Sequence, residues 1–567
     1  MMPCLRGVVL GALLVHETLG FTCVGVASAP GSDATRSSLR SAAFRKQQMA
    51  VRIRTDDEPS QQERHRVGLR GRRGTRRGTS RSSLSMASED NQRGEVASAR
   101  SPPVVTNVNG PERICVLGGG FGGLYTALRL QKMPWRGRKP VVTLVDKRDK
   151  FTFLPLLYEF AIGNAELDEV APTFRELLAG SGVSFVQGCA SGVDLNGKEV
   201  TVAGAVSDDL DGFMISDNPD LARTIKYDKL VLAVGAEPTS GIDKVPGARA
   251  HAIPFYSIED SYRVKQAIIR LKTLVKETSV ARVVVVGGSY AGVELSCNLA
   301  AKLGSGMRGV SGKVEVTLAT GSEVLAAATP ANREAGLRRL GESGVRVMAG
   351  TRVSEVKEDG GVVLRQRGGE DAASGEEVEV EADLLVWTAG TQPSSLLDSL
   401  DVPKDSRGRV EVDRRLRLIG GASGGGNGGG IGGAGGDVYC LGDIAAVQGL
   451  DLGCNAQVAL QQSDYVAYNI WADKERRRPL DFRFLDLGEM MNLGGLEGSM
   501  TTLGGRVKLT GKAAGLARRA VYAVRMPTNP QRLRAAASAA AGTAFDVTNA
   551  LLDVGLDILK RSTSKEK

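Results

Sequence analysis

The chain has 567 residues, of which 42% are hydrophobic and 24% charged, a composition typical of a globular protein with two or three domains. Its net charge of +9 lies entirely in residues 1–86. The other 481 residues carry 58 basic and 58 acidic side chains, so the body is not expected to bind nucleic acid. None of the seven cysteines forms a C-x-x-C pair, and His251 is the only histidine after residue 86, which argues against a zinc site or a histidine-based triad. The chemistry is therefore expected to come from a bound organic cofactor.

Residues 1–105 are predicted to be a targeting leader followed by a linker. A short apolar run from Val8 to Val15 follows one early arginine, as in a secretory signal, and is too short to span a bilayer. The stretch to about Met86 is rich in Ser and Arg and poor in acids, as in an organelle transit peptide. Such a bipartite leader resembles those of algal plastids acquired by secondary endosymbiosis, with the mitochondrion as the alternative address. An RNA-binding tail is disfavoured because GLRGRRGTRRGTSRSS contains no aromatic residue.

The first folded segment, ICVLGGGFGGLYTAL, contains a complete G-x-G-x-x-G fingerprint between a predicted strand and a predicted helix. Gly118 is expected to make the tight turn, Gly120 to let the backbone approach a pyrophosphate, and Gly123 to allow close helix packing. The next strand, PVVTLVD, ends on Asp146, which can accept from a ribose hydroxyl. This context predicts a dinucleotide site rather than a glycine-rich turn without a ligand.

Two further strands, KEVTVAG and TIKYDKLVLAVGAEP, are predicted to end in a turn at Gly235. The helix-like SIEDSYRVKQAIIRLKTLV then leads to a second unit, VVVVGGSYAGVEL, whose glycines are Gly287 and Gly292. This second fingerprint departs from the pattern at Ser289, and its second strand, KVEVTLAT, ends on Thr320 where an acid is expected. Loss of the acid favours tolerance of a 2′-phosphate, as in NADPH. The alternative is a degenerate unit that binds no nucleotide.

The second unit is predicted to close with EADLLVWTAGTQP, a strand and a turn at Gly390. Residues 420–436, of which 12 are glycine, are expected to form a flexible surface insertion. The segment DVYCLGDIAAV then reads as a strand that ends at Gly442 and Asp443, and the helix-like NAQVALQQSDYVAYNIW follows.

The order of these units resembles flavoproteins with two dinucleotide-binding domains. In that group the first unit holds FAD, the inserted unit holds NAD(P)H, and the late aspartate, here Asp443, contacts the ribityl chain of the flavin. Members that reduce disulfides carry a cysteine pair in the helix after the first loop. The corresponding LYTALRLQKM contains no cysteine, so a dithiol reductase is disfavoured.

The remaining motifs resemble the type II NAD(P)H:quinone dehydrogenases, and most closely their plastid C-type branch of demethylphylloquinone reductases. The resemblance is carried by AQVALQQ after the GD motif, by Gly292-Val293-Glu294 after the second loop, and by FYSIEDSYRV, ANREAG, NIWADKERRRPLDFRF and DLGEMMNLG. It extends from about Arg113 to Pro527.

The resemblance implies an α/β protein with two Rossmann-like domains, the NAD(P)H domain being inserted in the FAD domain, and a C-terminal membrane-associating region. The expected parts are the FAD-binding domain (111–278 and 391–480), the NAD(P)H-binding domain (279–390) and the C-terminal region (481–567).

The resemblance also implies the residues of the site. FAD is expected to be held by Gly118, Gly120, Gly122, Gly123, Asp146, Gly235, Gly442 and Asp443, and NAD(P)H by Gly287, Ser289, Gly292 and Gly390. The expected catalytic residues are Glu294, Gln457 and Gln461. Glu294 is expected near the nicotinamide–flavin contact, and the glutamines at the quinone end. The alternatives are a carboxylate favoured by the helix dipole and ordinary polar helix residues.

The implied reaction has two halves: a hydride passes from NADPH or NADH to the flavin, and a prenylated quinone then takes two electrons and two protons. The expected partners are a quinone, the surface of a thylakoid membrane or plastoglobule, and a second copy of the chain in a homodimer. An amphipathic helix over Phe545–Lys560 and the basic GGRVKLTGKAAGLARRAVYAVR are candidates for the membrane contact, and docking of that helix on the protein itself is the alternative. The rival functions are a flavin reductase with a protein acceptor such as ferredoxin and a scaffold like apoptosis-inducing factor.

Overall fold

The computed structural model describes residues 110–208, 212–215, 222–238, 241–278, 280–304, 313–366, 376–420 and 434–540, which belong to one compact unit. The predicted leader, residues 421–433 of the glycine-rich insert and the amphipathic helix predicted for Phe545–Lys560 lie outside these residues.

The first sheet is built on a parallel core that is buried on both faces. Its strands, in sheet order, are β19 (Val438–Cys440), β7 (Lys229–Leu232), β1 (Arg113–Leu117), β2 (Val141–Asp146), β3 (Val183–Asp194), β4 (Glu199–Asp208) and β5 (Gly212–Ile215), with β6 (Arg223–Lys226) also paired to β4. The strands from β19 to β3 are parallel, and β4 pairs antiparallel with its neighbours. All four residues of β7 are buried: Leu230–Leu232 form an apolar run, as is usual in parallel sheets, and the remaining residue is Lys229.

The second sheet is wholly parallel and lies between β7 and β19 in sequence, which confirms that one Rossmann-like domain is inserted in another. Its strands, in sheet order, are β12 (Arg346–Ala349), β11 (Lys313–Thr320), β10 (Val280–Val286), β16 (Leu384–Trp387) and β9 (Ala252–Pro254). β9 precedes the predicted boundary at residue 279, so the sheet reaches back beyond it. An antiparallel sheet of β13 (Thr351–Val356), β14 (Gly361–Gln366) and β15 (Glu377–Glu381) accompanies this domain.

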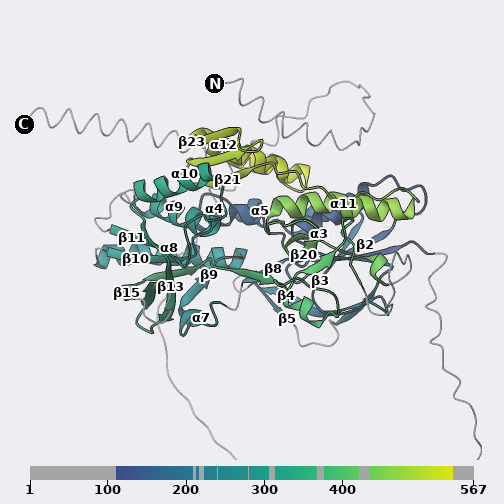
Figure 1. Ribbon diagram of the computed structural model, residues 1–567, viewed down its shortest axis with the longest axis horizontal. Helices are drawn as coiled ribbons and strands as arrows, with labels where there is room; N and C mark the ends of the chain where they lie inside the picture. Colours follow the sequence, from purple (N-terminus) through teal and green to yellow (C-terminus); the bar gives the residue numbers. More distant parts are fainter. Residues whose placement is uncertain are drawn as a thin grey trace, which may run out of the picture. The chain divides into compact units, whose positions relative to one another are not determined.

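The helices pack on and between the sheets (Figure 1). They are α3 (Phe121–Lys132), η1 (Leu154–Leu156), α4 (Leu157–Ala161), α5 (Leu167–Val170), α6 (Phe174–Leu178), α7 (Ala248–His251), α8 (Ile258–Thr278), α9 (Tyr290–Gly304), α10 (Pro330–Glu342), η3 (Ser395–Ser399), η4 (Ala434–Asp437), η5 (Gly442–Ile444), α11 (Ala456–Lys474) and α12 (Lys512–Arg525). Two short pairings are also present: β8 (Ala236–Pro238) with β17 (Thr391–Pro393), on the segments before and after the inserted domain, and β18 (Val410–Val412) with β20 (Ala445–Val447). The strands and helices predicted around both glycine loops and after Asp443 are confirmed.

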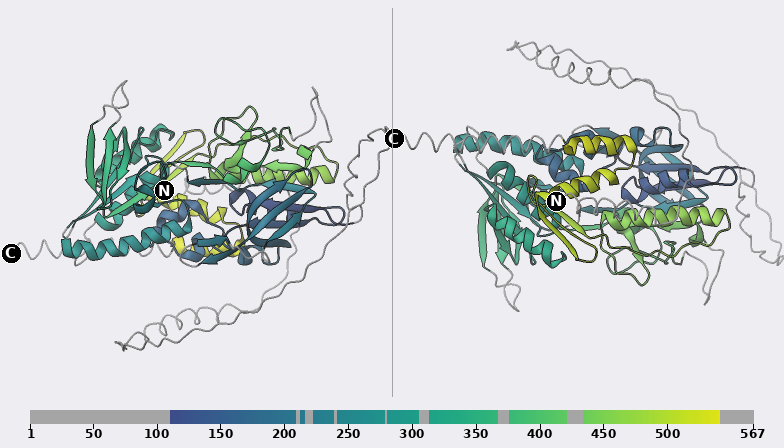
Figure 2. Two further views of the ribbon diagram at one scale, coloured as in Figure 1. Left: turned by 90° about the horizontal axis from the view of Figure 1, so that it is seen from below. Right: turned by 90° about the horizontal axis from the view of Figure 1, so that it is seen from above.

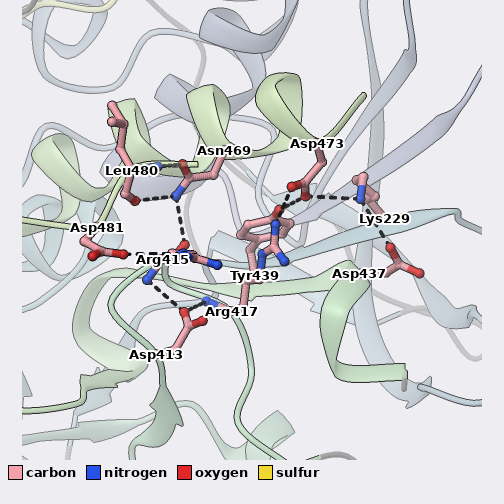
Figure 3. A network of polar contacts seen from close by, with 10 residues as sticks. All are labelled: Lys229, Asp413, Arg415, Arg417, Asp437, Tyr439, Asn469, Asp473, Leu480 and Asp481. Atoms are coloured by element: carbon pink, nitrogen blue, oxygen red, sulfur yellow. Dashed lines mark hydrogen bonds and ion pairs between the residues drawn. The ribbon is translucent and has the colours of Figure 1, made fainter. Parts of the chain in front are cut away.

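A polar network joins the two sequence-distant halves of the first domain (Figure 3). The carboxylate of Asp473 on α11 accepts from the Tyr439 hydroxyl at 2.5 Å, lies 3.6 Å from Lys229 Nζ and pairs with Arg417. Lys229 on β7 also contacts Asp437, at 3.2 Å. The network therefore holds β7, β19 and α11 in one arrangement.

The C-terminal part of the described chain adds a small antiparallel sheet and a helix. The strands are β21 (Glu489–Asn492), β22 (Gly498–Thr502) and β23 (Val507–Gly511), and α12 packs on all three. This segment is yellow in Figure 2 and contacts α9 and α10 of the inserted domain. Within the residues that the structure describes, no helix is long and apolar enough to cross a bilayer.

Candidate active site

The first glycine loop requires glycine at two positions, Gly118 for its backbone conformation and Gly123 for lack of space. Gly118 has φ of +97°, and a Cβ there would lie 2.3 Å from the Ala233 carbonyl oxygen. A Cβ on Gly123 would lie 1.8 Å from the Gly118 carbonyl oxygen, so α3 meets the loop closely. A Cβ on Gly122 would touch Leu441 at 3.1 Å.

The space in front of this loop is free on the side where a pyrophosphate is expected. A Cβ on Gly120, or on Gly235, three residues after the end of β7, would meet no atom within 4 Å. Gly120 is the N-cap of α3 and supplies no side-chain cap, so the first N–H groups of the helix can point to an anion. The loop fits a bound dinucleotide.

Asp146 is positioned by the loop itself. Its Oδ2 accepts from the Gly119 N–H at 2.6 Å and its Oδ1 from the Arg148 N–H at 2.8 Å. Burial raises the pKa of this carboxyl, and the two N–H donors act in the opposite direction. The carboxylate oxygens retain lone pairs for a ribose hydroxyl beside these bonds.

The Gly442 turn brings Asp443 to the start of α11. Gly442 has φ of +79°, and its N–H donates to Oε1 of the buried Gln462 at 2.6 Å. Among the described residues, no hydrogen bond or ion pair engages the Asp443 carboxylate, and burial raises its pKa. A partly buried carboxylate without a protein partner fits a hydroxyl-rich ligand, as the ribityl chain of FAD would be.

The second loop repeats the arrangement of the first. Gly287 has φ of +121°, and its N–H donates to the Ala319 carbonyl at 2.8 Å, as the Gly118 N–H donates to the Val145 carbonyl at 2.8 Å. A Cβ on Gly292 would lie 1.8 Å from the Gly287 carbonyl oxygen. The two sterically required glycines are therefore both present in the second loop.

Ser289 stands at the point where Gly120 stands in the first loop. The Ser289 carbonyl accepts from the Val293 N–H at 3.1 Å, which begins α9, and its side chain is exposed. Serine is among the preferred residues at the start of a helix. Gly390, after β16, also has positive φ, at +80°.

Glu294 lies in a buried polar cluster that joins both domains to the C-terminal segment. Its Oε1 accepts from the Asn492 N–H at 2.8 Å, and the Asn492 amide donates to Oε1 of Glu159 at 3.2 Å. Glu159, on α4, pairs with Arg518 and, at 3.5 Å, with Arg519, both on α12. Among the residues that the structure describes, no ion pair includes Glu294, whose carboxyl hydrogen-bonds with the Tyr158 hydroxyl.

The pKa values of the two carboxyls in this cluster are shifted in opposite directions. Burial raises the pKa of Glu294 to about 7, against the opposing Asn492 N–H and the charge of Arg518. Burial also acts to raise the pKa of Glu159, but the charges of Arg518 and Arg519 outweigh it and hold that pKa below its usual range. Glu294 can therefore exchange a proton near neutral pH.

Gln457 and Gln461 bind the segment that leads into β21. Gln457 accepts from the Leu487 N–H at 2.7 Å and donates to the Gly488 carbonyl at 3.2 Å. Gln461 accepts from the Leu485 N–H at 3.0 Å and donates to the Leu485 carbonyl at 2.8 Å. Both side-chain amides therefore form hydrogen bonds with backbone groups. Their contact with a quinone stays a prediction.

The sequence reasoning missed Glu159, Asn492, Arg518 and Gln462, which the structure places around the predicted residues. Gln462 adjoins Gln461 in the AQVALQQ motif, and Asn492 belongs to DLGEMMNLG, so those motifs contained a signal. Arg518 offered no such signal, because an arginine in a basic stretch is usually solvent-exposed, whereas this side chain is 1% exposed.

The sequence matches the family pattern of the pyridine nucleotide-disulphide oxidoreductases over residues 112–462. It is 36% identical over 421 residues to demethylphylloquinone reductase NdbB of Synechocystis, which covers 73% of this chain and 92% of that protein. It is 35% identical over 458 residues to the alternative NAD(P)H-ubiquinone oxidoreductase C1, chloroplastic/mitochondrial, of Arabidopsis thaliana, covering 76% and 81% of the two chains. The structure of NDH2 from Plasmodium falciparum in complex with NADH matches with a TM-score of 0.63 over 75% of this chain and 97% of that one. Their identity of 17% limits that likeness to the fold.

Glu294→Gln should change how stability depends on pH. The pKa of Glu294 is about 7 in the folded protein, and an unfolded glutamate titrates at about 4.3, so the stabilising contribution of the acid form falls as pH rises between these values. Relative to that of wild type, the free energy of unfolding of the variant should increase by about 2–3 kcal/mol between pH 5 and pH 8. Urea unfolding measures it. The exposed Glu334→Gln is the control. A variant-to-wild-type difference that is equal at both pH values contradicts this assignment.

Gly292→Ala and Ser289→Gly should show that the second loop requires glycine at position 292 and does not require it at position 289. Alanine at 292 places Cβ 1.8 Å from a backbone oxygen, so nucleotide binding should weaken by about 10–100-fold. Ser289→Gly should change the dissociation constant by less than about threefold, because serine and glycine differ little as N-caps. Calorimetric titration with NADH and NADPH measures both. Gly304→Ala, whose Cβ meets open space on the same helix, should bind like wild type, and equal loss in all three variants would refute the distinction.

Proposed function

Since the chain belongs to the pyridine nucleotide-disulphide oxidoreductase family, we propose that it is an FAD-dependent, non-proton-pumping NAD(P)H:quinone oxidoreductase of type II. The proposed electron acceptor is a prenylated plastid quinone or naphthoquinone. The observation that carries the proposal is that one chain holds two dinucleotide loops with matching backbone contacts, one in each parallel sheet. The relatives from Synechocystis and Arabidopsis, whose names describe quinone reduction, support the same acceptor class.

The first loop is assigned to FAD. Gly118, Gly120, Gly122 and Gly123 shape the approach to the helix, Asp146 offers lone pairs to a ribose, and Gly235 leaves room beside the loop. Asp443, held at the start of α11 by the Gln462–Gly442 bond, is assigned to the ribityl hydroxyls. When bound, FAD supplies the centre that accepts a hydride and releases two electrons.

The second loop is assigned to NAD(P)H, through Gly287, Ser289, Gly292 and the turn at Gly390. Its helix, α9, carries Glu294 in the second turn, so nucleotide binding and the polar cluster are joined by one rigid element. Glu294 is proposed to hold the exchangeable proton, because its carboxyl is neutral below about pH 7 and charged above it.

The quinone end is assigned to the region around residues 485–488. Gln457 and Gln461 bind the backbone of this segment, so they position it and are proposed to form one side of the quinone path. They lie in the first two turns of α11, the helix that also anchors the Gly442 turn.

A surface of exposed apolar side chains is proposed to touch the membrane or plastoglobule that holds the quinone. Its members are Leu485 (52% exposed), Leu503 (67%), Leu516 (38%), Val524 (42%) and Leu533 (74%). Leu503 stands in the β22–β23 turn with φ of +54°, a strained conformation for leucine. Exposed Arg506, Lys508 and Lys512 follow it and can contact lipid headgroups.

The proposal includes the plastid as the location, with the mitochondrion as the alternative, and a homodimer as the assembly. The transit-peptide composition of the leader supports an organelle, and the Arabidopsis relative is named as chloroplastic/mitochondrial. Thylakoid and plastoglobule surfaces offer the same kind of lipid contact to the apolar side chains.

The two half-reactions test the function. The purified protein should carry a flavin spectrum, bleach with NAD(P)H without oxygen, and regain colour when a soluble quinone is added. Gln461→Ala should slow the second step by about tenfold or more and leave the first within about twofold, since a misplaced positioning group costs rate. Lys474→Ala, on the last turn of the same helix, is the control.

The outcomes separate the rivals. A colourless protein overturns the proposal. A yellow protein whose flavin is reduced by NAD(P)H but ignores quinones leaves a protein acceptor or a scaffold role. Equal slowing of both steps by Gln461→Ala refutes its place at the quinone end.

Leu503→Asp should weaken binding to lipid vesicles. Burial of a leucine side chain contributes about 1.5–3 kcal/mol, so the partition coefficient should fall roughly tenfold or more. Co-sedimentation with vesicles that contain one third anionic lipid measures it. Ile269→Asp, at another exposed apolar site on α8 (53%), should bind like wild type, and a similar loss in both variants would contradict the assigned surface.

A further inference from the structure

The end of β11 has no carboxylate where Rossmann-like domains bind the adenine ribose. Thr320 occupies that position, is 5% exposed, and accepts from the Ser322 N–H at 3.4 Å. A Cβ on Gly288 would lie 2.6 Å from the Thr320 hydroxyl oxygen, so the threonine packs directly beneath the second glycine loop. A neutral group there does not repel a 2′-phosphate, as an aspartate or glutamate would.

The side chain of Arg352, which comes from another strand, lies next to the end of β11. A Cβ on Gly321 would be 2.9 Å from Arg352 Cγ and 3.1 Å from Arg352 Nε, so the arginine side chain crosses the residue next to Thr320. Arg352 belongs to β13, which contacts β11. The pairing of β13 with its sheet therefore delivers a guanidinium to the ribose position.

The charge of Arg352 is not neutralised within the described chain. No ion pair between described residues includes it, and its side chain is exposed. Its cross-strand partner in the register is Arg365, which pairs instead with Glu377, Nε to Oε1 at 2.9 Å. Two like charges directly opposite on one face are unfavourable unless an anion joins them.

The nearest acid in sequence does not cancel this charge. Glu323, three residues after Thr320, forms an ion pair with Arg333 at 2.5 Å. The loop after β11 therefore combines a compensated Glu323–Arg333 pair with an uncompensated arginine and the exposed hydroxyl of Ser322.

We propose that Arg352 binds the 2′-phosphate of NADPH, with Ser322 as a second hydrogen-bond donor, and thereby makes the chain selective for NADPH over NADH. A guanidinium can donate two parallel hydrogen bonds to a phosphate, which the 2′-hydroxyl of NADH cannot match. The assignment rests on the proposed function of the second loop and names the nucleotide that it takes.

Direct binding tests the site without the reaction. Calorimetric titration of the full chain should show adenosine 2′,5′-bisphosphate binding at least about tenfold tighter than 5′-AMP, as expected for a charge-assisted pair. Arg352→Gln should reduce this preference to within about threefold. Arg365→Gln, the matched change on the neighbouring strand, should keep it. Equal binding of the two ligands to wild type, or equal loss in both variants, overturns the proposal.

Flavin reduction without oxygen or quinone gives the second readout. Arg352→Gln should raise the KM for NADPH by about 10–100-fold with kcat nearly unchanged and leave NADH unaffected, while Arg352→Lys should recover part of the loss. Equal effects on the two nucleotides overturn the proposal. A wild type that selects NADPH but does not reduce quinone would refute the proposed acceptor and leave the Arg352 assignment standing.

Discussion

The buried carboxylate of Glu159 is the contact on which the arrangement of the parts depends, because three separate stretches of the chain converge on it. Glu159 comes from the first domain, Asn492 from β21, and Arg518 and Arg519 from α12. Removing one partner of a buried ion pair leaves an uncompensated charge, which costs about 3–5 kcal/mol. The C-terminal segment is therefore an integral part of the site and not an appendage to it.

That contact also sets the chemistry next to it. Arg518 and Arg519 are engaged by Glu159, so Glu294, in the same cluster, has only neutral hydrogen-bond donors, the Asn492 N–H and the Tyr158 hydroxyl, and the more distant charge of Arg518. Two buried carboxyls in one cluster thus differ in protonation because only one has guanidinium partners. A proton-exchanging group can exist beside a permanent ion pair for this reason.

Helix α11 performs the corresponding task on the other side of the site. Its amide side chains bind the Gly442 turn through Gln462 and the 485–488 backbone through Gln457 and Gln461. Its far end is fixed by the network around Asp473, which reaches β7 and β19. One helix therefore sets the positions of the Gly442 turn and of the segment that leads into β21.

The sequence by itself determined the two parallel sheets, the insertion of one domain in the other, and the positions of the glycine loops. The sheets and the loops follow from local physics: apolar runs, turns that require positive φ, and helix starts, all read within a few residues. The insertion was implied by the resemblance to flavoproteins with two dinucleotide-binding domains. It left open how Ser289 affects the second loop, and the structure answers this, because Ser289 stands where no steric requirement exists while Gly287 and Gly292 meet theirs. Only the tertiary structure decided the contacts between distant residues, such as Arg518 with Glu159 and Arg352 with Gly321, which lie 359 and 31 positions apart. Such pairs carry no local signal, because burial and charge compensation arise only when the segments pack.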